Sequence, residues 1–404
     1  MTDPLKGSPE VHLLLPKGDV EEPEMSIVIP ALNEALTIKQ FIDWCWEGLR
    51  KANIKGEILI VDSSTDKTDQ MALSAGARVL KTPKRGLGRA YIDAIDYIRS
   101  PFVLMGDCDC TYDFRELGVF MKEFRQGYDF IMGTRFKGYI EPKAMPPLHR
   151  YFGTPVTTAI LNIMYGTRFS DIHCGMRGIT LSALRRISLQ SQGWEYASEM
   201  ILKAAKMKLK TTEVPVRFYK DPPGRLSHHK RSGWTSPWLA GWVNLRVMFI
   251  FCPEFFLFKP GLVLMVLGLI FTGVLTGGTF FIGHLGFSLH SMLFGITLAT
   301  TGFSSMQLGL LSRVYHNFDP EFTEKMEKIL TYNRGVLIGI VMVFVGFGLT
   351  CPLIHNWCKS GFKLFMFHNY ALFGLLLIIL GFQLFTFTLM FEIITKGLAH
   401  DKRG

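Results

Sequence analysis

The sequence contains few cysteines, and they are scattered along the chain. Seven occur in 404 residues, and an odd number without regular spacing predicts no disulfide framework of the kind that stabilises small secreted proteins. Cys108, Cys110 and Cys174, together with His173, are side chains that can bind zinc, but their spacing matches no common finger or ribbon. The N-terminus lacks the apolar segment of a secretory signal, which predicts no cleaved signal peptide.

A complete glycine fingerprint for dinucleotide binding is also missing. Gly86 and Gly88 begin the pattern, but its third glycine is absent. The first expected strand closes on Pro30 without a glycine turn, which argues against a nicotinamide-dependent enzyme. Asp62, at the end of the second expected strand, would nevertheless suit a ribose.

Ionisable residues are almost absent from the apolar segments of the second half of the chain. Four segments are expected to span a membrane: about 260–282, 289–311, 335–355 and 371–394. Each has close to the roughly 20 residues that cross a hydrocarbon core about 30 Å thick. The scarcity of charge within them argues against a transporter coupled to protons or ions. Two pairs of glycines four residues apart, Gly273 with Gly277 and Gly335 with Gly339, would permit close helix contacts or a homo-oligomer.

The net charge of +10 indicates an anionic partner. Basic residues concentrate just before the apolar half and in its loops, which favours a membrane surface or phosphate-bearing substrates over nucleic acid. Lys and Arg residues are concentrated in the 312–334 loop and at the C-terminus. By the positive-inside rule, the loop, the C-terminus and the N-terminal domain are therefore expected in the cytoplasm. We therefore expect a multi-pass integral membrane protein. The sequence leaves open a bridge between Cys351 and Cys358, near the end of the third span.

Short apolar strands alternate with amphipathic helices through the first half of the chain. Strands are expected at about 25–30, 57–62, 77–80 and 103–106. This alternation predicts an α/β domain with a doubly wound, mainly parallel sheet. Tryptophans at helical spacing before the first span predict a helix in the membrane interface. The expected divisions are a flexible tail at 1–24, the α/β domain at 25–232, interfacial amphipathic helices at 233–259, four transmembrane helices at 260–396 and a cytoplasmic tail at 397–404.

Two carboxylates one residue apart, Asp107 and Asp109, follow the fourth expected strand. The end of a buried strand delivers side chains to the sheet edge at which open α/β sheets bind ligands. Mg²⁺ and Mn²⁺ commonly bridge one or two carboxylates to substrate phosphates. The pair therefore predicts a site for a metal-diphosphate, although a solvated acidic turn would have the same sequence.

A series of short motifs follows in fixed order over about residues 25–260. They are SIVIPALNE, ILIVDSSTDKT, RGLGRAY, GDCDCTYD, MGTRF, SDIHCGMRG, GWEYASEM and EVPVRFYK. Together they resemble the family 2 glycosyltransferases of GT-A fold. Within that family they are most similar to the dolichol-phosphate mannose synthases and polyprenyl-phosphate glycosyltransferases.

The resemblance implies how the nucleotide part of a sugar donor would be bound. Pro30, Leu32 and Glu34 would line the base and ribose, and Asp62 would accept a hydrogen bond from the base. Asp107 would contact the diphosphate. The family's usual Asp-Asp-Gly-Ser loop is one residue shorter here, so the resemblance does not indicate which base is bound.

The resemblance also implies that Asp109, Arg135 and Arg225 are the catalytic residues. Asp109 would be the more direct ligand of Mg²⁺ or Mn²⁺, with Asp107 beside it. Arg135, Arg225 and Ser227 would bind the phosphate of an acceptor lipid or the donor diphosphate.

The implied reaction is inverting transfer of one sugar from a nucleotide-diphosphate sugar, GDP-mannose or a UDP-hexose, to a polyprenyl phosphate such as dolichyl or undecaprenyl phosphate. Two alternatives remain at this point. One is a glycosyltransferase whose acceptor is a hydroxyl on another glycolipid or a protein. The other is a lipid flippase or transporter whose cytoplasmic domain only binds nucleotide. The QxxRW element of processive polysaccharide synthases is absent, which disfavours a polymerase.

Overall fold

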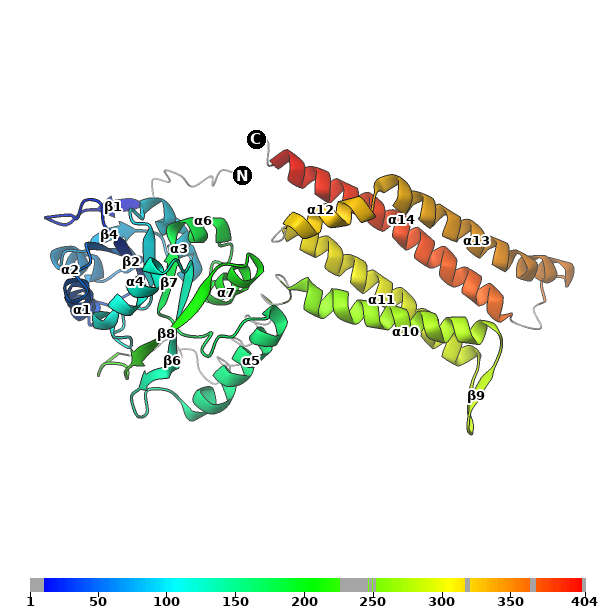
Figure 1. Cartoon of the computed structure of the whole chain (residues 1–404), viewed down its shortest axis with the longest axis horizontal. Coiled ribbons are helices and arrows are strands. Elements are labelled where there is room, and N and C mark those ends of the chain that lie inside the picture. Colours follow the sequence, from blue (N-terminus) through cyan, green and yellow to red (C-terminus); the bar gives the residue numbers. More distant parts are fainter. Residues whose placement is uncertain are drawn as a thin grey trace. The chain divides into compact units, whose positions relative to one another are not determined.

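The chain forms two units, Met1–Met248 and Phe249–Gly404. The structure, a computed structural model, describes residues 11–225, 246, 249, 252–316, 320–363 and 368–401 (Figure 1). The first unit contains an α/β sheet and the second consists mainly of long helices.

An eight-stranded sheet organises the first unit. Its strands are β1 His12–Leu14, β2 Met25–Ala31, β3 Gly56–Asp62, β4 Arg78–Lys81, β5 Phe102–Met105, β6 Phe130–Ile140, β7 Arg177–Thr180 and β8 Thr211–Phe218. They lie in the order β1-β4-β3-β2-β5-β7-β6-β8. The run from β4 to β5 is parallel, β7 is antiparallel to both β5 and β6, and β6 is parallel to β8. The predicted doubly wound, mainly parallel sheet is confirmed.

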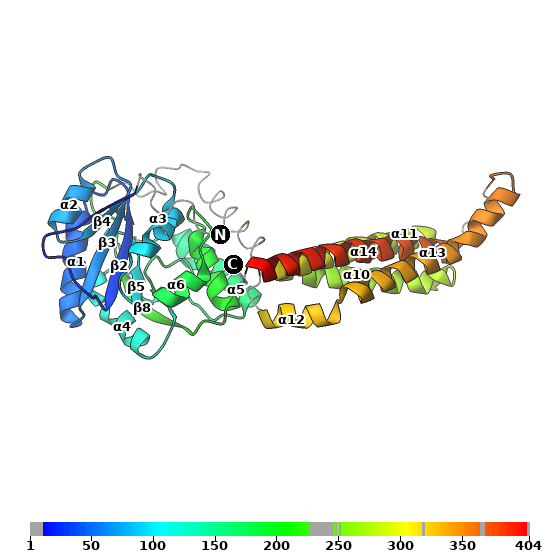
Figure 2. The same ribbon diagram turned by 90° about the horizontal axis from the view of Figure 1, so that it is seen from above.

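Helices cover both faces of this sheet. They are α1 Ile38–Lys51, α2 Thr68–Ser74, α3 Leu87–Ala94, α4 Gly118–Arg125, α5 Thr154–Tyr165, α6 Leu181–Ile187 and α7 Tyr196–Lys206, with short turns η1 Ile95–Tyr97, η2 Phe114–Glu116 and η3 His149–Gly153. Figure 2 shows α1, α2 and α4 on one side of the sheet and α3 on the other, where α3 and α6 contact α7. Because both faces are covered, all seven residues of β3 are buried, as expected for a continuous apolar run.

The N-terminal segment is more ordered than the sequence predicts. A flexible tail was expected at 1–24, but β1 pairs antiparallel with β4 at the sheet edge. Asp19 also forms a two-pronged ion pair with Arg99, both bonds being 2.9 Å long. A three-residue edge strand is too short to give a periodic signal, which explains why the sequence pattern did not reveal it.

The second unit is a set of long helices with one hairpin. Its elements are η4 Glu254–Phe258, α10 Lys259–Thr276, β9 Phe280–Ile282, β10 Leu285–Phe287, α11 Leu289–His316, α12 Pro320–Ile329, α13 Tyr332–Lys359 and α14 Asn369–Asp401. In the described ranges, three helices are long and apolar enough to cross a membrane: Glu254–Thr276, Tyr332–Lys359 and Asn369–Gly397. The second predicted span, 289–311, falls in α11 and is not among these three. Polar residues lower the hydropathy of α11; they include Thr297, Thr300, Ser304 and Gln307.

Small residues bring these helices together in pairs. A Cβ at Gly346 of α13 would lie 2.5 Å from the carbonyl oxygen of Gly374 in α14, and one at Gly339 would lie 2.8 Å from that of Gly381. Glycine therefore permits backbone contact along α13 and α14, as the Gly335–Gly339 spacing predicted. The other predicted pair is different: Gly273 meets nothing within 4 Å.

Three further expectations concern the second unit and the residues just before it. Some of them are corrected by the structure, and some fall on residues that it does not describe. The predicted interfacial helices at 233–259 fall largely on residues that are not described, and the described part, Glu254–Phe258, continues directly into α10. The predicted tail begins inside α14, which runs to Asp401. Cys351 and Cys358 are free thiols seven residues apart on α13, a separation too great for a bridge within one helix.

Candidate functional site

Several chain segments converge at one edge of the sheet. The parallel strands β2, β3, β5, β6 and β8 all end there, and the antiparallel β7 begins there, because Met105 is paired with Arg177. Glu34 follows β2, Asp107 and Asp109 follow β5, and Arg225 follows β8. Asp62 is the last residue of β3, and Arg135 lies within β6. The topology thus brings the predicted site residues to the edge at which open α/β sheets bind ligands.

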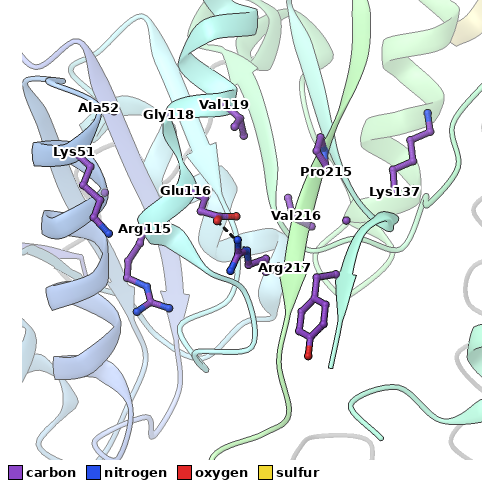
Figure 3. Close-up of a pocket in the computed structure, with 13 residues that line it drawn as sticks. Lys51, Ala52, Arg115, Glu116, Gly118, Val119, Lys137, Pro215, Val216 and Arg217 are labelled. Carbon is purple, nitrogen blue, oxygen red and sulfur yellow. Dashed lines mark ion pairs between the residues drawn. The ribbon is translucent and has the colours of Figure 1, made fainter. Parts of the chain in front are cut away.

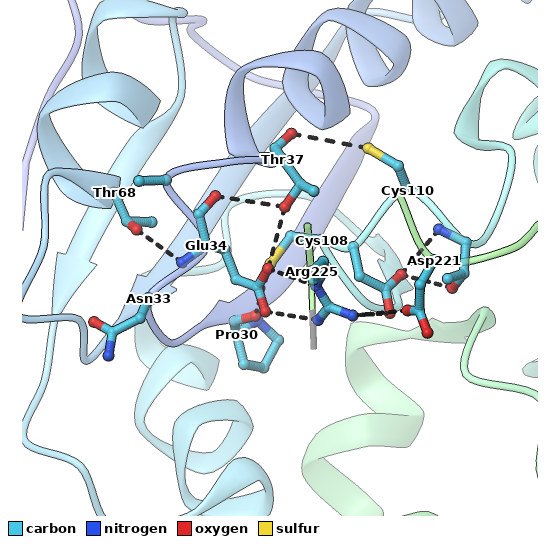
Figure 4. A network of polar contacts seen from close by, with 12 residues as sticks. Pro30, Asn33, Glu34, Thr37, Thr68, Cys108, Cys110, Asp221 and Arg225 are labelled. Atoms are coloured by element: carbon cyan, nitrogen blue, oxygen red, sulfur yellow. Dashed lines mark hydrogen bonds and ion pairs between the residues drawn. The ribbon is translucent and has the colours of Figure 1, made fainter. Parts of the chain in front are cut away.

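Arg225 lies at the centre of an acidic cluster, defined as Glu34, Asp107, Asp109 and Asp221. Figure 4 shows Arg225 with Glu34 and Asp221. Its guanidinium donates to both carboxylate oxygens of Glu34, at 2.7 and 2.9 Å. It also donates to Asp109 at 3.3 Å and to Asp221 at 3.0 Å. The arginine side chain is only 10% exposed, so it neutralises these carboxylates where water screens charge poorly.

Asp109 and Asp107 differ in their surroundings. Asp109 accepts hydrogen bonds from the backbone N–H and the hydroxyl of Thr111, at 3.0 and 2.6 Å. No described residue hydrogen-bonds the Asp107 carboxylate, and burial, together with the charge of Asp109, raises the pKa of Asp107 to about 7. Burial also raises the pKa of Asp109. The carboxylate of Asp107 therefore lies where an additional cation would be stabilising.

These carboxylates fit a hard divalent cation in part. Carboxylate oxygens are the ligands that Mg²⁺ and Mn²⁺ prefer, and Asp107 lacks a compensating donor. Over the described ranges, however, no three His, Cys, Asp or Glu side chains are arranged to hold an ion. An ion bound by Asp107 and Asp109 would therefore need further oxygens from a substrate, as a diphosphate would supply.

The loops after β2 and β3 are tied to each other by side chains that the sequence analysis did not single out. Asn33 has a left-handed backbone (φ 57°). Its side-chain oxygen accepts from the N–H of Thr65 at 3.0 Å, and its own N–H donates to Ser64 Oγ at 2.7 Å. The N–H of Glu34 donates to Thr68 at 3.0 Å. Asparagine adopts a left-handed backbone more readily than most residues. The asparagine in the loop directly after the first expected strand was therefore the signal that the sequence offered.

The predicted nucleotide-binding residues occupy this part of the edge. The Asp62 side chain is buried and accepts from the N–H of Ser64 at 3.2 Å and from Lys81 at 2.7 Å. The carbonyl of Pro30 accepts from the Cys108 thiol at 3.5 Å. Leu32, in the loop directly after β2, is half-buried. Asp62 therefore already has a cationic partner, which the sequence did not indicate.

Arg135 differs from its predicted role. Its guanidinium donates to both oxygens of Asp171, at 2.7 and 2.8 Å, and its backbone N–H donates to the same carboxylate at 3.1 Å. Both side chains are buried. Arg135 is thus a bidentate partner of Asp171, and its guanidinium does not join the acidic cluster. The sequence showed an arginine at a strand end but not the carboxylate that binds it.

The loop before β7 connects the Arg135–Asp171 pair to the acidic cluster. The N–H of Gly175 donates to the Tyr112 hydroxyl at 2.8 Å, and a Cβ at Gly175 would overlap the Asp107 carboxylate. Arg177 holds the loop by donating to the carbonyls of Cys174 and Ile172, at 2.9 and 3.1 Å. Glycine is therefore required beside Asp107.

A second concavity, of about 640 Å³, lies elsewhere on this unit (Figure 3). Its cationic lining residues are Lys51, Arg115, Lys137 and Arg217. Each is paired with a carboxylate: Glu47, Asp113, Glu213 and Glu116, respectively. None of the predicted site residues that the structure describes lines this concavity, so it is a weaker candidate than the edge that carries Arg225.

The structure thus brings Glu34, Asp107, Asp109 and Arg225 together. It places Asp62 at the end of β3, next to β2, and gives Arg135 a separate partner. Ser227 lies outside the described residues. The sequence analysis missed Asp221, although its position four residues before Arg225 was an available signal.

Comparison with known proteins identifies the chain. Glycosyl transferase family 2 matches residues 26–188, and the glycosyltransferase family 2 C-terminal transmembrane region matches residues 310–395. The low-salt glycan biosynthesis hexosyltransferase Agl6 of Haloferax volcanii is 35% identical over 365 residues, covering 87% of this chain and 84% of the relative. A dolichyl-phosphate hexose transferase of the same organism is 30% identical over 168 residues, covering 41% of this chain and 70% of the relative.

Among solved structures, mannosyl-3-phosphoglycerate synthase from Rubrobacter xylanophilus aligns with a TM-score of 0.43 at 21% identity. The alignment covers 56% of this chain and 72% of that protein. The family identification rests on the sequence matches, which span both the sheet domain and the apolar helices. The chain belongs to glycosyltransferase family 2 and is a membrane glycosyltransferase.

Proposed function

We propose that this enzyme transfers one hexose from a nucleotide-diphosphate hexose to a polyprenyl phosphate, with inversion at the anomeric carbon. The observation that carries the proposal is the acidic cluster around Arg225 at the carboxyl edge of the sheet. The described part of the same chain also contains three candidate membrane spans. Two relatives, one a hexosyltransferase and the other a dolichyl-phosphate hexose transferase, support a hexose donor and a lipid phosphate acceptor.

On the donor side, Asp107 and Asp109 would hold Mg²⁺ or Mn²⁺ with the diphosphate. The ion would supply neutralisation of the charge that develops on the leaving group. The tied loops after β2 and β3 would frame the base and ribose, with Pro30, Glu34 and Asp62 on their inner side. GDP-mannose and UDP-hexoses are the candidate donors.

On the acceptor side, the lipid phosphate is already anionic at neutral pH, so the site needs to position it rather than deprotonate it. Arg225 is suited to this because its guanidinium can bind two phosphate oxygens. Arg225 is now bonded to the carboxylates of the acidic cluster. A divalent cation could neutralise these carboxylates in its place, which would leave the guanidinium free to bind phosphate. Arg135 would have to abandon a buried bidentate pair, so we assign it the positioning of the loop that carries Asp171.

The test uses the full chain, reconstituted in vesicles that contain polyprenyl phosphate, with a panel of labelled sugar nucleotides. Lipid products are separated by thin-layer chromatography. We expect Asp109→Ala to lower transfer by about 10²–10³-fold, the cost of removing one electrostatic contact to a transition state. Asp43→Ala is the matched control, because that carboxylate is exposed on α1 and paired with Lys39.

Transfer by Asp109→Ala at the wild-type rate would contradict the proposed donor site. Product on a hydroxyl of another glycolipid or a protein, with none on the polyprenyl phosphate, would contradict the acceptor. Membership of an enzyme family argues against the non-enzymatic alternative, a flippase that only binds nucleotide.

A further inference from the structure

The segment that begins at Leu148 and continues through η3 and α5 exposes six of its apolar side chains. The exposed ones are Leu148, Tyr151, Phe152, Val156, Ile160 and Ile163. Ile163 is 75% exposed, Tyr151 74% and Phe152 63%. At 3.6 residues per turn, Val156, Ile160 and Ile163 of α5 lie within about 60° of one another around the helix. Leu148, Tyr151 and Phe152 extend this surface toward the N-terminus. The six side chains form a continuous apolar stripe, which we call the α5 stripe.

The inner face of the same helix is less apolar than its outer face. Thr154, Thr158, Leu161 and Met164 are its buried residues. A surface helix of a soluble protein normally has the opposite arrangement, with apolar residues inward and polar ones outward. Soluble monomers seldom expose contiguous apolar patches of this kind, and such patches mark interaction surfaces.

The charge around the α5 stripe indicates what covers it. Residues 142–170 contain Lys143, His149, Arg150 and Arg168 but no Asp or Glu. Lys143 and Arg168 are exposed. A second copy of this chain would place like charges opposite one another, which is unfavourable. An anionic lipid surface matches both the apolar stripe and the cations around it.

We propose that the α5 stripe lies in the headgroup region of an anionic bilayer, with the helix in the plane of the membrane. This contact would be additional to the membrane-spanning helices of the second unit. It does not depend on the sugar or the acceptor. Helices of this composition bury their apolar face about 5–10 Å into the boundary between headgroups and acyl chains.

The position of α5 in the chain gives this contact a consequence for the site. Thr157 on α5 is hydrogen-bonded to His173 at 2.9 Å, and His173 belongs to the loop whose Gly175 lies against Asp107. A bilayer against α5 would therefore hold the headgroup plane close to the edge that carries the acidic cluster. A lipid acceptor could then reach the site without leaving the membrane.

The test places a photoreactive benzoylphenylalanine at Ile163 in the full chain, reconstituted in phosphatidylcholine vesicles with or without phosphatidylglycerol. The same probe at Val119 is the control, because Val119 is an exposed apolar residue of α4. After illumination, mass spectrometry identifies the adducts. We expect at least tenfold more lipid adduct at Ile163 than at Val119, and more with phosphatidylglycerol than without.

Three results would overturn the proposal. Equal lipid labelling at the two positions would show that the α5 stripe does not contact lipid specifically. Cross-links from Ile163 to a second copy or to another segment of the chain, in place of lipid, would identify a protein occupant. Equal labelling in both kinds of vesicle would remove the assignment to an anionic surface. The thermal midpoint of each probe variant should match that of the wild type, because both positions are exposed.

Discussion

Removal of Arg225 tests whether the acidic cluster is built around a cation. Arg225→Ala leaves Glu34 and Asp109 without the guanidinium that now bonds both. Loss of one partner of a buried ion pair costs about 3–5 kcal/mol. Because Arg225 remains 10% exposed, we expect the lower limit, about 3 kcal/mol. For a domain of about 150–250 residues this corresponds to a fall of about 6–12 °C in the unfolding midpoint.

The assay follows thermal unfolding of the full chain by intrinsic fluorescence, with a nucleoside diphosphate present throughout to supply the further oxygens that an ion at this site needs. Unfolding is measured first in EDTA and then in millimolar Mg²⁺ or Mn²⁺. In EDTA the variant should unfold at a lower temperature than the wild type. Added metal should raise the midpoint of Arg225→Ala more than that of the wild type, because a divalent cation can neutralise the carboxylates that Arg225 leaves behind.

Arg217→Ala is the matched control for this experiment. Arg217 is exposed and paired with Glu116 beside the second concavity, so its removal should leave both the midpoint and its response to metal unchanged. The reasoning would be refuted if Arg225→Ala unfolded in EDTA at the wild-type temperature. It would also be refuted if Mg²⁺ stabilised the variant and the wild type equally.

Three further predictions follow from buried contacts. Arg135→Ala should lower the free energy of unfolding by about 3–5 kcal/mol, because Asp171 would keep a buried charge without a partner; an unchanged midpoint with only weaker acceptor binding would instead support direct phosphate contact. Burial lowers the pKa of His173 to about 4 from an ordinary value of 6.5, so the native state resists its protonation. The contribution of neutral His173 to the free energy of unfolding is fully present above about pH 6.5 and is lost as the pH falls toward 4. The wild type should therefore lose about 2–3 kcal/mol more than His173→Gln between pH 7 and 4.5 in denaturant titrations, and equal losses would contradict this. Gly346→Leu should lower the midpoint of the helical unit, at a cost of about 1–3 kcal/mol from overpacking, whereas Gly348→Leu, with nothing within 4 Å, should not; equal midpoints would contradict close packing of α13 and α14.

The parallel half of the sheet could be predicted because its signals are local. Runs such as Gly56–Asp62 are apolar throughout and are bounded by polar residues, and their alternation with amphipathic helices leaves few possible topologies. The strand β7 could not be placed in the same way. It has four residues, and its antiparallel direction depends on pairing with β5 and β6, which are far away in the sequence.

The position of the candidate residues at the sheet edge could be inferred from the sequence, whereas their contacts could not. Asp107 and Asp109 follow a buried strand, so their position at the edge was a local inference. The partner of Arg225, by contrast, is 191 residues away at Glu34. No pattern in a single sequence indicates that Arg225 bonds Glu34 while Arg135 bonds Asp171, because each pairing arises only when distant strand ends meet.

The membrane half shows where composition alone is misleading. The segment at 289–311 has the length of a span, but the polar residues of α11 make it less apolar than the other three helices. Two of these side chains link α11 to α14: Gln307 donates to the carbonyl of Gln383 at 3.2 Å, and Gln383 donates to Ser304 at 3.1 Å. Hydropathy summed along a segment does not record such bonds between helices.

The reversed direction of β7 has a consequence for how this domain can change in evolution. Connections between strands usually tolerate insertions, since they lie on the surface. The segment from Asp171 to Arg177 is fixed at one end by the pair with Arg135 and at the other by pairing with Met105. An added or deleted residue there would shift Gly175 out of register with Asp107. Length variation among homologous chains should therefore avoid this short stretch, even though it is a loop.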